Sequence, residues 1–356
     1  MIYEYKKKNI IKIILGLALI LALYNSSISL GTFLTYYTFP YRVVDSEGDS
    51  LRFLASLEDI VWENYEHRGL LGIYDLLEEE FTPLNFETRA YVNFKEGVRE
   101  ELRNRQTFLN RFFSMDRRTG IISEYLDIDY FLDTDLRIEK NPNVPQVLIF
   151  HTHAMSEFFI DGGYDIMEGI VGVGATLASY LRSYGLNVIH YKGVYDMVDG
   201  RIHRSGAYER IEPSIAYILN QHPTIELVLD IHRDGVPETT SRNVFVRYIN
   251  EVPTAAIMFV NGLSAVNENG SSRRLHNIPN NYVRQNMALT FNMQMALNYY
   301  FGDITRRMFL TPFRYINHLR PNSMLIEVGT QLNTRAEAHN AMRPLAHTLY
   351  SVLFSY

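Results

Sequence analysis

The feature of this sequence that most constrains its fold is the alternation of short apolar runs with helix-like segments after residue 145. The apolar runs are QVLIF (146–150), LNVIHY (186–191), IELVLDI (225–231), NVFVRYI (243–249), AAIMFV (255–260) and SMLIEVG (323–329). Segments with helical periodicity separate most of them, at 172–185, 205–222 and 281–301. Continuous apolar strands that alternate with helices are typical of a mostly parallel sheet covered on both faces. We therefore predict an α/β fold, with a mostly parallel twisted sheet flanked by helices.

The segment KNPNVP (140–145) predicts a domain boundary just before the first of these strands, because proline interrupts a preceding helix. Residues 37–140 are charged and aromatic, and amphipathic helices are expected at 60–81 and 94–113. We interpret this region as a helical spacer or small N-terminal module without chemistry of its own. The strand-rich domain is expected over residues 141–356.

The N-terminus predicts a membrane anchor. Lys6, Lys7 and Lys8 precede the apolar segment 10–24, which is short of the roughly 20 residues that span a bilayer. Inclusion of the softer apolar residues up to 34 makes a span plausible, and the lysines place the N-terminus inside. A cleaved signal peptide is the alternative, but no Ala-x-Ala-like site follows the apolar core. We favour a retained anchor within residues 1–36, and either interpretation places the rest of the chain outside the cytoplasm.

Composition excludes several classes of function. The formal net charge is −6 and no basic stripe occurs beyond the extreme N-terminus, so nucleic acid is not expected as a partner. The chain has no cysteine, which excludes disulfides, thiolate metal sites and a cysteine nucleophile. Any metal site must therefore use His, Asp and Glu side chains.

Polar side chains cluster where three of the apolar runs end. They are His151, His153 and Glu157 after the first run, Asp230, His232, Arg233 and Asp234 in the third, and Glu327 and Asn333 in and after the last. Parallel α/β sheets place their functional sites at the carboxyl ends of strands. If these three strands are neighbours, the side chains converge on one crevice.

The residue types in this cluster predict a metal-dependent hydrolase. Two imidazoles and one carboxylate with an open fourth position are a common catalytic zinc set. His153 and Glu157 are four residues apart and can bind one ion, while Asp230 could orient the imidazole of His232. Glu327 would serve as the general base to a metal-bound water. A single histidine at a strand end is more often structural, so the prediction rests on the joint occurrence.

The spacing leaves open which of His151 and His153 is the ligand. The two residues face the same way on a continuing strand. We favour His153, because it is nearer to Glu157 and lies beyond the strand proper.

Several longer strings in the chain resemble the stage II sporulation protein P family. They are HTHAMSE, VGVGATLASYLRSYGLNVIHYKGVYD, the segment from SGAYERIEPSIAYIL to HPTIELVLDIHRDG, and PNSMLIEVGTQLNTRAEA, in that order. The resemblance covers roughly residues 141–356 and implies an exported, membrane-anchored peptidoglycan hydrolase of endospore-forming bacteria, active on the cell wall during sporulation. It further implies a zinc amidase-like fold, as in the N-acetylmuramoyl-L-alanine amidases.

The resemblance also implies roles for individual residues. His232 matches the later zinc-binding histidine, Glu327 the catalytic glutamate and Asn333 the asparagine that follows it, while the first histidine falls at His151 or His153. The glutamate ligand is either Glu157, which we prefer because it lies in the HTHAMSE string, or Glu168, which stands at the head of a predicted helix. The family is associated with peptide cleavage in the wall and with a partner, stage II sporulation protein D.

The expected reaction is hydrolysis of the amide between the lactyl group of muramic acid and L-alanine. Zinc and Arg233 would stabilise the charge on the carbonyl oxygen, and Asp230, Asp234 and Asn333 would support the site or contact substrate. Two alternatives remain open at this stage. One is a zinc carboxypeptidase or other peptide hydrolase, and the other is a non-catalytic wall-binding scaffold.

Overall fold

The computed structural model describes residues 84 and 87–354. The expected anchor within residues 1–36 and the expected helix at 60–81 lie outside these residues. Within the part that the structure describes, no helix combines the length and the apolar character that a membrane span requires.

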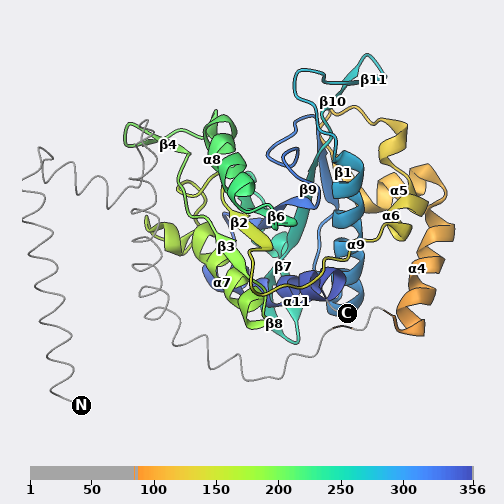
Figure 1. Ribbon diagram of the computed structural model, residues 1–356, viewed down its shortest axis with the longest axis horizontal. Helices are drawn as coiled ribbons and strands as arrows, with labels where there is room; N and C mark the ends of the chain where they lie inside the picture. Colours follow the sequence, from red (N-terminus) through yellow and green to blue (C-terminus); the bar gives the residue numbers. More distant parts are fainter. Residues whose placement is uncertain (1–83, 85–86, 355–356) are drawn as a thin grey trace, which may run out of the picture. The chain divides into compact units, whose positions relative to one another are not determined.

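A seven-stranded sheet forms the centre of the fold (Figure 1). Its spatial order is β1 (Phe113–Met115), β12 (Met308–Thr311), β9 (Ile257–Gly262), β13 (Ser323–Thr330), β6 (Leu227–Asp234), β2 (Val147–Phe150) and β3 (Val188–His190). All neighbours are parallel except β9 and β13, which are antiparallel. The predicted α/β fold with a mostly parallel sheet is confirmed.

Helices cover both faces of the sheet. On one side, α7 (Ile170–Ser183) and α9 (Val283–Phe301) contact the strands, and α11 (Met342–Leu353) packs against both of these helices. On the other face, α8 (Ala207–Gln221) buries Ile211, Ile215 and Leu219 against Leu148 and Phe150 of β2. These apolar positions recur every four residues, so they form one stripe of the helix. The same face carries the polar residues at the strand ends.

The segment before residue 140 contributes to the same sheet. Contacts group residues 80–356 into one compact unit, whereas the sequence suggested a boundary at 140. The edge strand β1 belongs to this segment, as do α4 (Arg89–Leu102), α5 (Arg105–Phe112) and α6 (Ile128–Asp133). The Phe108 ring lies edge-on to Phe291 of α9 with centroids 5.6 Å apart, and the Asn292 side chain donates a hydrogen bond to the carbonyl of Phe131. This segment therefore completes one end of the sheet and its core.

The expected helix at 94–113 is divided in two. Asn104 lies between α4 and α5, and its side chain accepts a hydrogen bond from the backbone N–H of Thr107. An asparagine in this position caps a new helix. The single amphipathic pattern in the sequence therefore extends across two helices.

The run NVFVRYI (243–249) does not form a strand of the central sheet, and that prediction is wrong. It forms β7 (Val246–Ile249), which pairs only with β8 (Val252–Ala255) in a separate antiparallel hairpin. Asn250 and Glu251 connect the two strands with φ values of 49° and 68°. Two positive φ values in a two-residue connection produce a tight hairpin, so the chain reverses before it can enter the sheet.

The remaining elements are short. They are β4 (Met197–Val198), β5 (Arg201–Ile202), β10 (Ala265–Glu268), β11 (Ser271–Arg274), α10 (Arg335–Asn340) and the 3-10 turns η2 (Ser123–Tyr125), η3 (Ile166–Glu168) and η4 (Arg242–Phe245). Strands β4 and β5 form a hairpin between β3 and α8, and β10 and β11 form another that projects from the sheet (Figure 1).

Candidate active site

The three strands that end in polar residues are adjacent in space. They lie in the order β13, β6, β2 and all run parallel. In this register Phe150 is opposite Asp230, and His232 is opposite Glu327. Residues opposite one another on neighbouring strands point to the same face of a sheet. The three strands are therefore parallel neighbours, and their polar ends lie side by side.

His153, Glu157 and His232 come together on this face. Strand β2 ends at Phe150, and the turn over residues 152–156 brings the chain back toward β6. The Oε1 atom of Glu157 lies 3.2 Å from Nδ1 of His232, and the rings of His153 and His232 have centroids 5.4 Å apart. All three side chains are buried, and the Nδ1 atom of His153 has no hydrogen-bond partner.

Asp230 holds the imidazole of His232 from the other side. One carboxylate oxygen of Asp230 lies 2.7 Å from Nε2 of His232. The carboxylate also accepts hydrogen bonds from the backbone N–H and the hydroxyl of Thr152, at 3.0 and 2.7 Å. With Nε2 directed to Asp230, Nδ1 of His232 is the nitrogen that faces Glu157. The sequence predicted that Asp230 orients this imidazole, and such a role requires a contact of this kind.

Opposite charges surround the buried carboxylate of Glu157. Burial raises the pKa of this group, but His232 and the guanidinium of Arg204 outweigh it, so the pKa is lowered overall. For His232, burial lowers the pKa, while Asp230 and Glu157 raise it well above the ordinary value. The contact between Glu157 and His232 therefore favours the charged form of each group.

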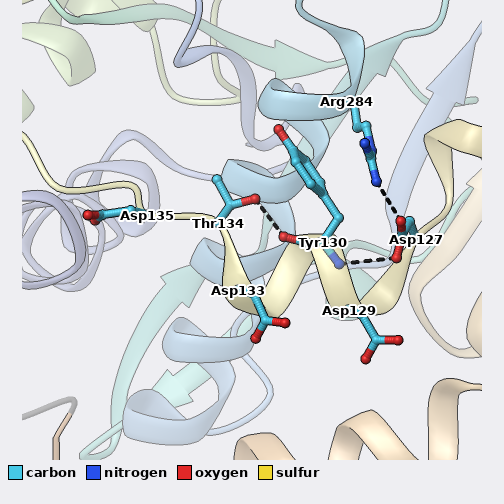
Figure 2. Close-up of a pocket in the computed structure, with 7 residues that line it drawn as sticks. All are labelled: Asp127, Asp129, Tyr130, Asp133, Thr134, Asp135 and Arg284. Carbon is cyan, nitrogen blue, oxygen red and sulfur yellow. Dashed lines mark hydrogen bonds and ion pairs between the residues drawn. The ribbon is translucent and has the colours of Figure 1, made fainter.

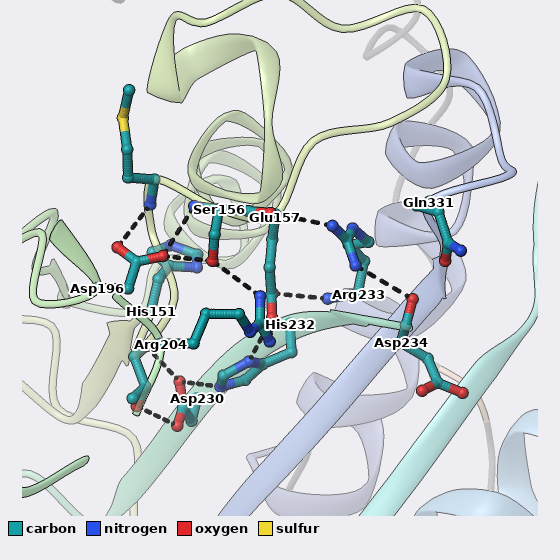
Figure 3. Close-up of polar contacts among 12 residues, drawn as sticks. His151, Ser156, Glu157, Asp196, Arg204, Asp230, His232, Arg233, Asp234 and Gln331 are labelled. Carbon is teal, nitrogen blue, oxygen red and sulfur yellow. Dashed lines mark hydrogen bonds and ion pairs between the residues drawn. The ribbon is translucent and has the colours of Figure 1, made fainter. Parts of the chain in front are cut away.

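Arg233 positions the loop that carries Glu157 (Figure 3). Its guanidinium donates to the carbonyl oxygens of Ser156, Phe158 and Asp234, at 3.0, 2.9 and 3.4 Å. Its backbone N–H donates to Oε2 of Glu157 at 2.9 Å. Since the guanidinium is directed to backbone carbonyls, the geometry favours a positioning role over the predicted contact with the substrate carbonyl.

Glu327, the predicted general base, lies beside the cluster. It lies opposite His232 on the neighbouring strand, and its Oε2 atom is buried without a hydrogen-bond partner. Burial raises its pKa, and the negative charges of Glu157 and Asp234 raise it further, against the lowering effect of His232. A carboxylate with a raised pKa is the better proton acceptor.

His151 points away from this cluster. Its Nδ1 atom donates to the carbonyl of Ile231 and its Nε2 atom contacts Nε2 of His190, both at 2.9 Å. Gly174 of α7 packs against the same ring, since a Cβ there would lie 2.4 Å from its Cε1 atom. The strand ends before the turn, so His151 and His153 face different sides instead of one. The geometry favours His153 as the ligand.

The other candidate residues have partners outside the cluster. Glu168 accepts a hydrogen bond from the backbone N–H of Gly163 at 2.7 Å, so the geometry favours Glu157 as the carboxylate ligand. Asp234 pairs with Arg306 at 2.7 Å. The buried amide of Asn333 accepts from the backbone N–H of Thr330 and donates to Phe245 and Glu337, which fixes the loop after β13.

Three residues of the site were not predicted from the sequence. Tyr208 of α8 lies parallel to His232, with centroids 6.4 Å apart, and edge-on to His153 at 5.6 Å. Arg204 contacts Glu157, and Asp196 accepts hydrogen bonds from the backbone N–H groups of residues 155 and 156. They come from the segment 196–208, which carries no strand-end pattern. Asp196 and Tyr208 lie within strings that resemble the family, but nothing in those strings marks them as site residues, and Arg204 lies outside the strings.

The donor set fits a zinc ion in its chemistry. Two imidazoles and one carboxylate meet at the cluster, and a buried nitrogen of His153 is unpaired. In the part of the chain that is described, however, no three His, Asp or Glu side chains are arranged so that they could hold a metal ion.

A surface pocket lies beside α6, away from this cluster (Figure 2). It is lined by Asp127, Asp129, Tyr130, Asp133, Thr134, Asp135 and Arg284. Its carboxylates are already paired with arginines: Arg284 binds Asp127, and Arg99 binds both Asp129 and Asp133. Nothing in the pocket therefore indicates a ligand.

A protein-family model matches most of the chain. The model of stage II sporulation protein P (SpoIIP) matches residues 85–350. The chain belongs to this family. The match begins well before residue 141, which agrees with the place of α4–α6 and β1 in the same compact unit.

Comparison of this SpoIIP family member with solved structures finds amidases. N-acetylmuramoyl-L-alanine amidase AmiC2 of Nostoc punctiforme is 14% identical, with a TM-score of 0.36, and the match covers 59% of this chain and 96% of that chain. An N-acetylmuramoyl-L-alanine amidase from Clostridium difficile 630 is 12% identical, with a TM-score of 0.34, over 59% and 96%. The CwlD amidase from Clostridioides difficile, in complex with the GerS lipoprotein, is 12% identical, with a TM-score of 0.33, over 58% and 94%. Comparison with curated proteins gives no match.

Proposed function

We propose that this protein is a zinc-dependent peptidoglycan hydrolase that cleaves the amide between the lactyl group of muramic acid and L-alanine. The observation that carries the proposal is the convergence of His153, Glu157, His232 and Glu327 at the ends of three adjacent parallel strands. Membership of the SpoIIP family supports peptidoglycan as the substrate.

In this proposal His153, Glu157 and His232 hold the zinc ion. The ion would supply Lewis-acid chemistry, by polarising the substrate carbonyl and lowering the pKa of a water molecule. Asp230 contacts Nε2 of His232, so Nδ1 is the nitrogen available as a ligand. Arg233 holds the loop 156–158, which fixes the position of Glu157.

Glu327 performs the proton transfers. It accepts the proton of the attacking water through its unpaired Oε2 atom and later gives this proton to the leaving amine of L-alanine. The aromatic ring of Tyr208 packs against both histidines.

The test is Glu327→Gln in the full-length protein, with Glu226→Gln as the control. Glu226 is exposed and precedes β6 at the end of the strand opposite the site. We expect Glu327→Gln to keep its zinc and to lose about 10²–10⁴-fold of its activity on purified peptidoglycan, the usual contribution of a general base. Glu226→Gln should keep both. Retained activity in Glu327→Gln would exclude Glu327 as the base.

Product analysis distinguishes this reaction from the alternatives. Mass spectrometry of the released fragments should show free stem peptides with an N-terminal L-alanine. Fragments cut only within the peptide would instead indicate a peptidase, and a protein without stoichiometric zinc would indicate a scaffold. An anchor within residues 1–36, a catalytic region outside the cytoplasm and association with stage II sporulation protein D are part of the same proposal.

A further inference from the structure

Arg204 contacts the same carboxylate that the zinc proposal assigns to the metal. It follows the β4–β5 hairpin, and its Nη2 atom donates to Oε1 of Glu157 at 2.9 Å (Figure 3). Its Nη1 atom donates to the hydroxyl of Ser156 at 2.8 Å. The side chain of Arg204 is 45% exposed, whereas that of Glu157 is 1% exposed. A guanidinium thus reaches from solvent to a buried ligand candidate.

The contact uses the oxygen that a metal would need. Oε2 of Glu157 faces the backbone N–H of Arg233, so Oε1 is the oxygen directed toward His232. Arg204 donates to that same oxygen. A dication bound there would lie a few ångströms from the guanidinium, at a poorly hydrated position where like charges repel strongly.

We propose that Arg204 is a displaceable counter-ion of Glu157, which leaves the carboxylate when zinc binds and thereby weakens the affinity for zinc. The inference rests on the proposed zinc site. Arg204 balances the buried charge of Glu157 until the ion takes its place. It then turns to solvent, which its half-exposed side chain permits.

The two arginines at Glu157 differ in how they are held. The guanidinium of Arg233 donates to three backbone carbonyls and is fixed with the strand and loop. Both contacts of the Arg204 guanidinium are to side chains, Ser156 and Glu157. The second kind of contact can break without movement of the backbone, so Arg204 is the residue that exchanges with the ion.

The first test measures zinc affinity of the full-length protein by competition with a chromophoric chelator. Arg204→Gln should bind zinc about ten-fold more tightly than the unmodified protein, the order expected when a charge-assisted hydrogen bond no longer competes. Arg204→Lys, which keeps the charge, should lie between the two. The control Arg201→Gln removes a charge three residues away, on an exposed part of the hairpin, and should leave the affinity unchanged.

Equal or weaker zinc binding by Arg204→Gln would overturn the inference. A damaged fold could not produce tighter binding, so the expected result cannot arise from a structural defect. If the unmodified protein binds no zinc, the proposed function fails. If it binds zinc and the variant shows no gain, only the role of Arg204 fails.

The second test follows the displacement itself. Phenylglyoxal modifies accessible arginines, and mass spectrometry of peptides measures the rate at each position. Addition of zinc to the unmodified protein should raise the rate at Arg204 several-fold and leave the rate at Arg233 unchanged. An unchanged or lower rate at Arg204 would contradict the exchange.

Discussion

Asp230 is a buried residue whose contact with His232 can control the site. Its carboxylate is buried and contacts Nε2 of His232. It also accepts hydrogen bonds from the backbone N–H and the hydroxyl of Thr152. It therefore fixes which nitrogen of His232 faces Glu157. A histidine ligand with an orienting carboxylate binds metal more tightly than one without.

The first prediction follows from this contact. Asp230→Asn should lower zinc affinity about 10- to 100-fold. The neutral amide interacts more weakly with the imidazole, and the substitution removes a negative charge beside the ligand. Isothermal titration of the apoprotein with zinc measures the change. Glu226→Gln is the matched control, because it also removes one carboxylate beside β6 but at the exposed, opposite end. A variant Asp230→Asn with unchanged affinity would show that His232 is oriented by other contacts.

At the scale of residues, the sequence predicted which types of side chain would converge but not their orientations. His232, Glu157 and Glu327 follow from their positions at the ends of apolar strands. The choice between His151 and His153 depends on where β2 stops. A turn begins directly after Phe150, so the two-residue spacing no longer places both histidines on one face. The contact of Arg204 with Glu157 depends on the β4–β5 hairpin, and no periodic pattern in the sequence predicts this hairpin.

At the scale of elements, helix α7 packs closely against His151 and His190. Gly174 lies in the middle of the helix, where glycine is normally unfavourable. A Cβ at this position would lie 2.4 and 2.5 Å from the ring of His151 and 3.1 Å from His190. The glycine therefore allows the helix to approach the sheet closely.

The second prediction compares two helical glycines. Gly174→Ala should destabilise the protein by about 1–3 kcal/mol, because the methyl group overpacks a rigid site. Gly97→Ala in α4 is the matched control, since nothing lies within 4 Å of its added Cβ. It should stabilise the protein by about 0.5–1 kcal/mol through helix propensity alone. Urea unfolding measures both, and a Gly174→Ala variant as stable as Gly97→Ala would contradict the packing.

Strands were predictable where an apolar run in the sequence corresponds to a strand that is buried on both faces. The buried strands β2, β6 and β13 read as continuous apolar runs, as strands covered on both faces do. β7 has the same kind of run, but its hairpin partner follows after two residues. The four-residue strand β12 was not predicted, because it is too short to show a period.

At the scale of the whole molecule, the segment before residue 140 belongs to the fold. β1 extends the sheet at β12, and Phe108 and Phe131 pack against Phe291 of α9. Arg284 of α9 also pairs with Asp127. The prolines of 140–145 thus mark the start of a strand and do not separate two independent units.

The third prediction concerns truncation. A protein of residues 141–356 should unfold at a lower urea concentration than one of residues 80–356, because it lacks β1 and exposes the aromatic surface of α9. The loss should be at least about 3–5 kcal/mol, the usual cost of removing one large buried aromatic side chain. Fluorescence of a dye that binds exposed apolar surface gives a second measurement. Equal stability of the two fragments would show that residues 89–133 are dispensable for the core.

The position of β13 has a consequence for how the protein is made. This strand lies between β9 and β6, yet it is synthesised after both of them. A ribosome-bound chain that ends before residue 323 lacks β13. Strands β9 and β6 would then each have an unpaired edge, because β13 pairs with both of them in the complete fold. Such edges are sites of mispairing and aggregation. This last strand of the sheet also contains Glu327, so a prematurely terminated chain would lack the proposed general base.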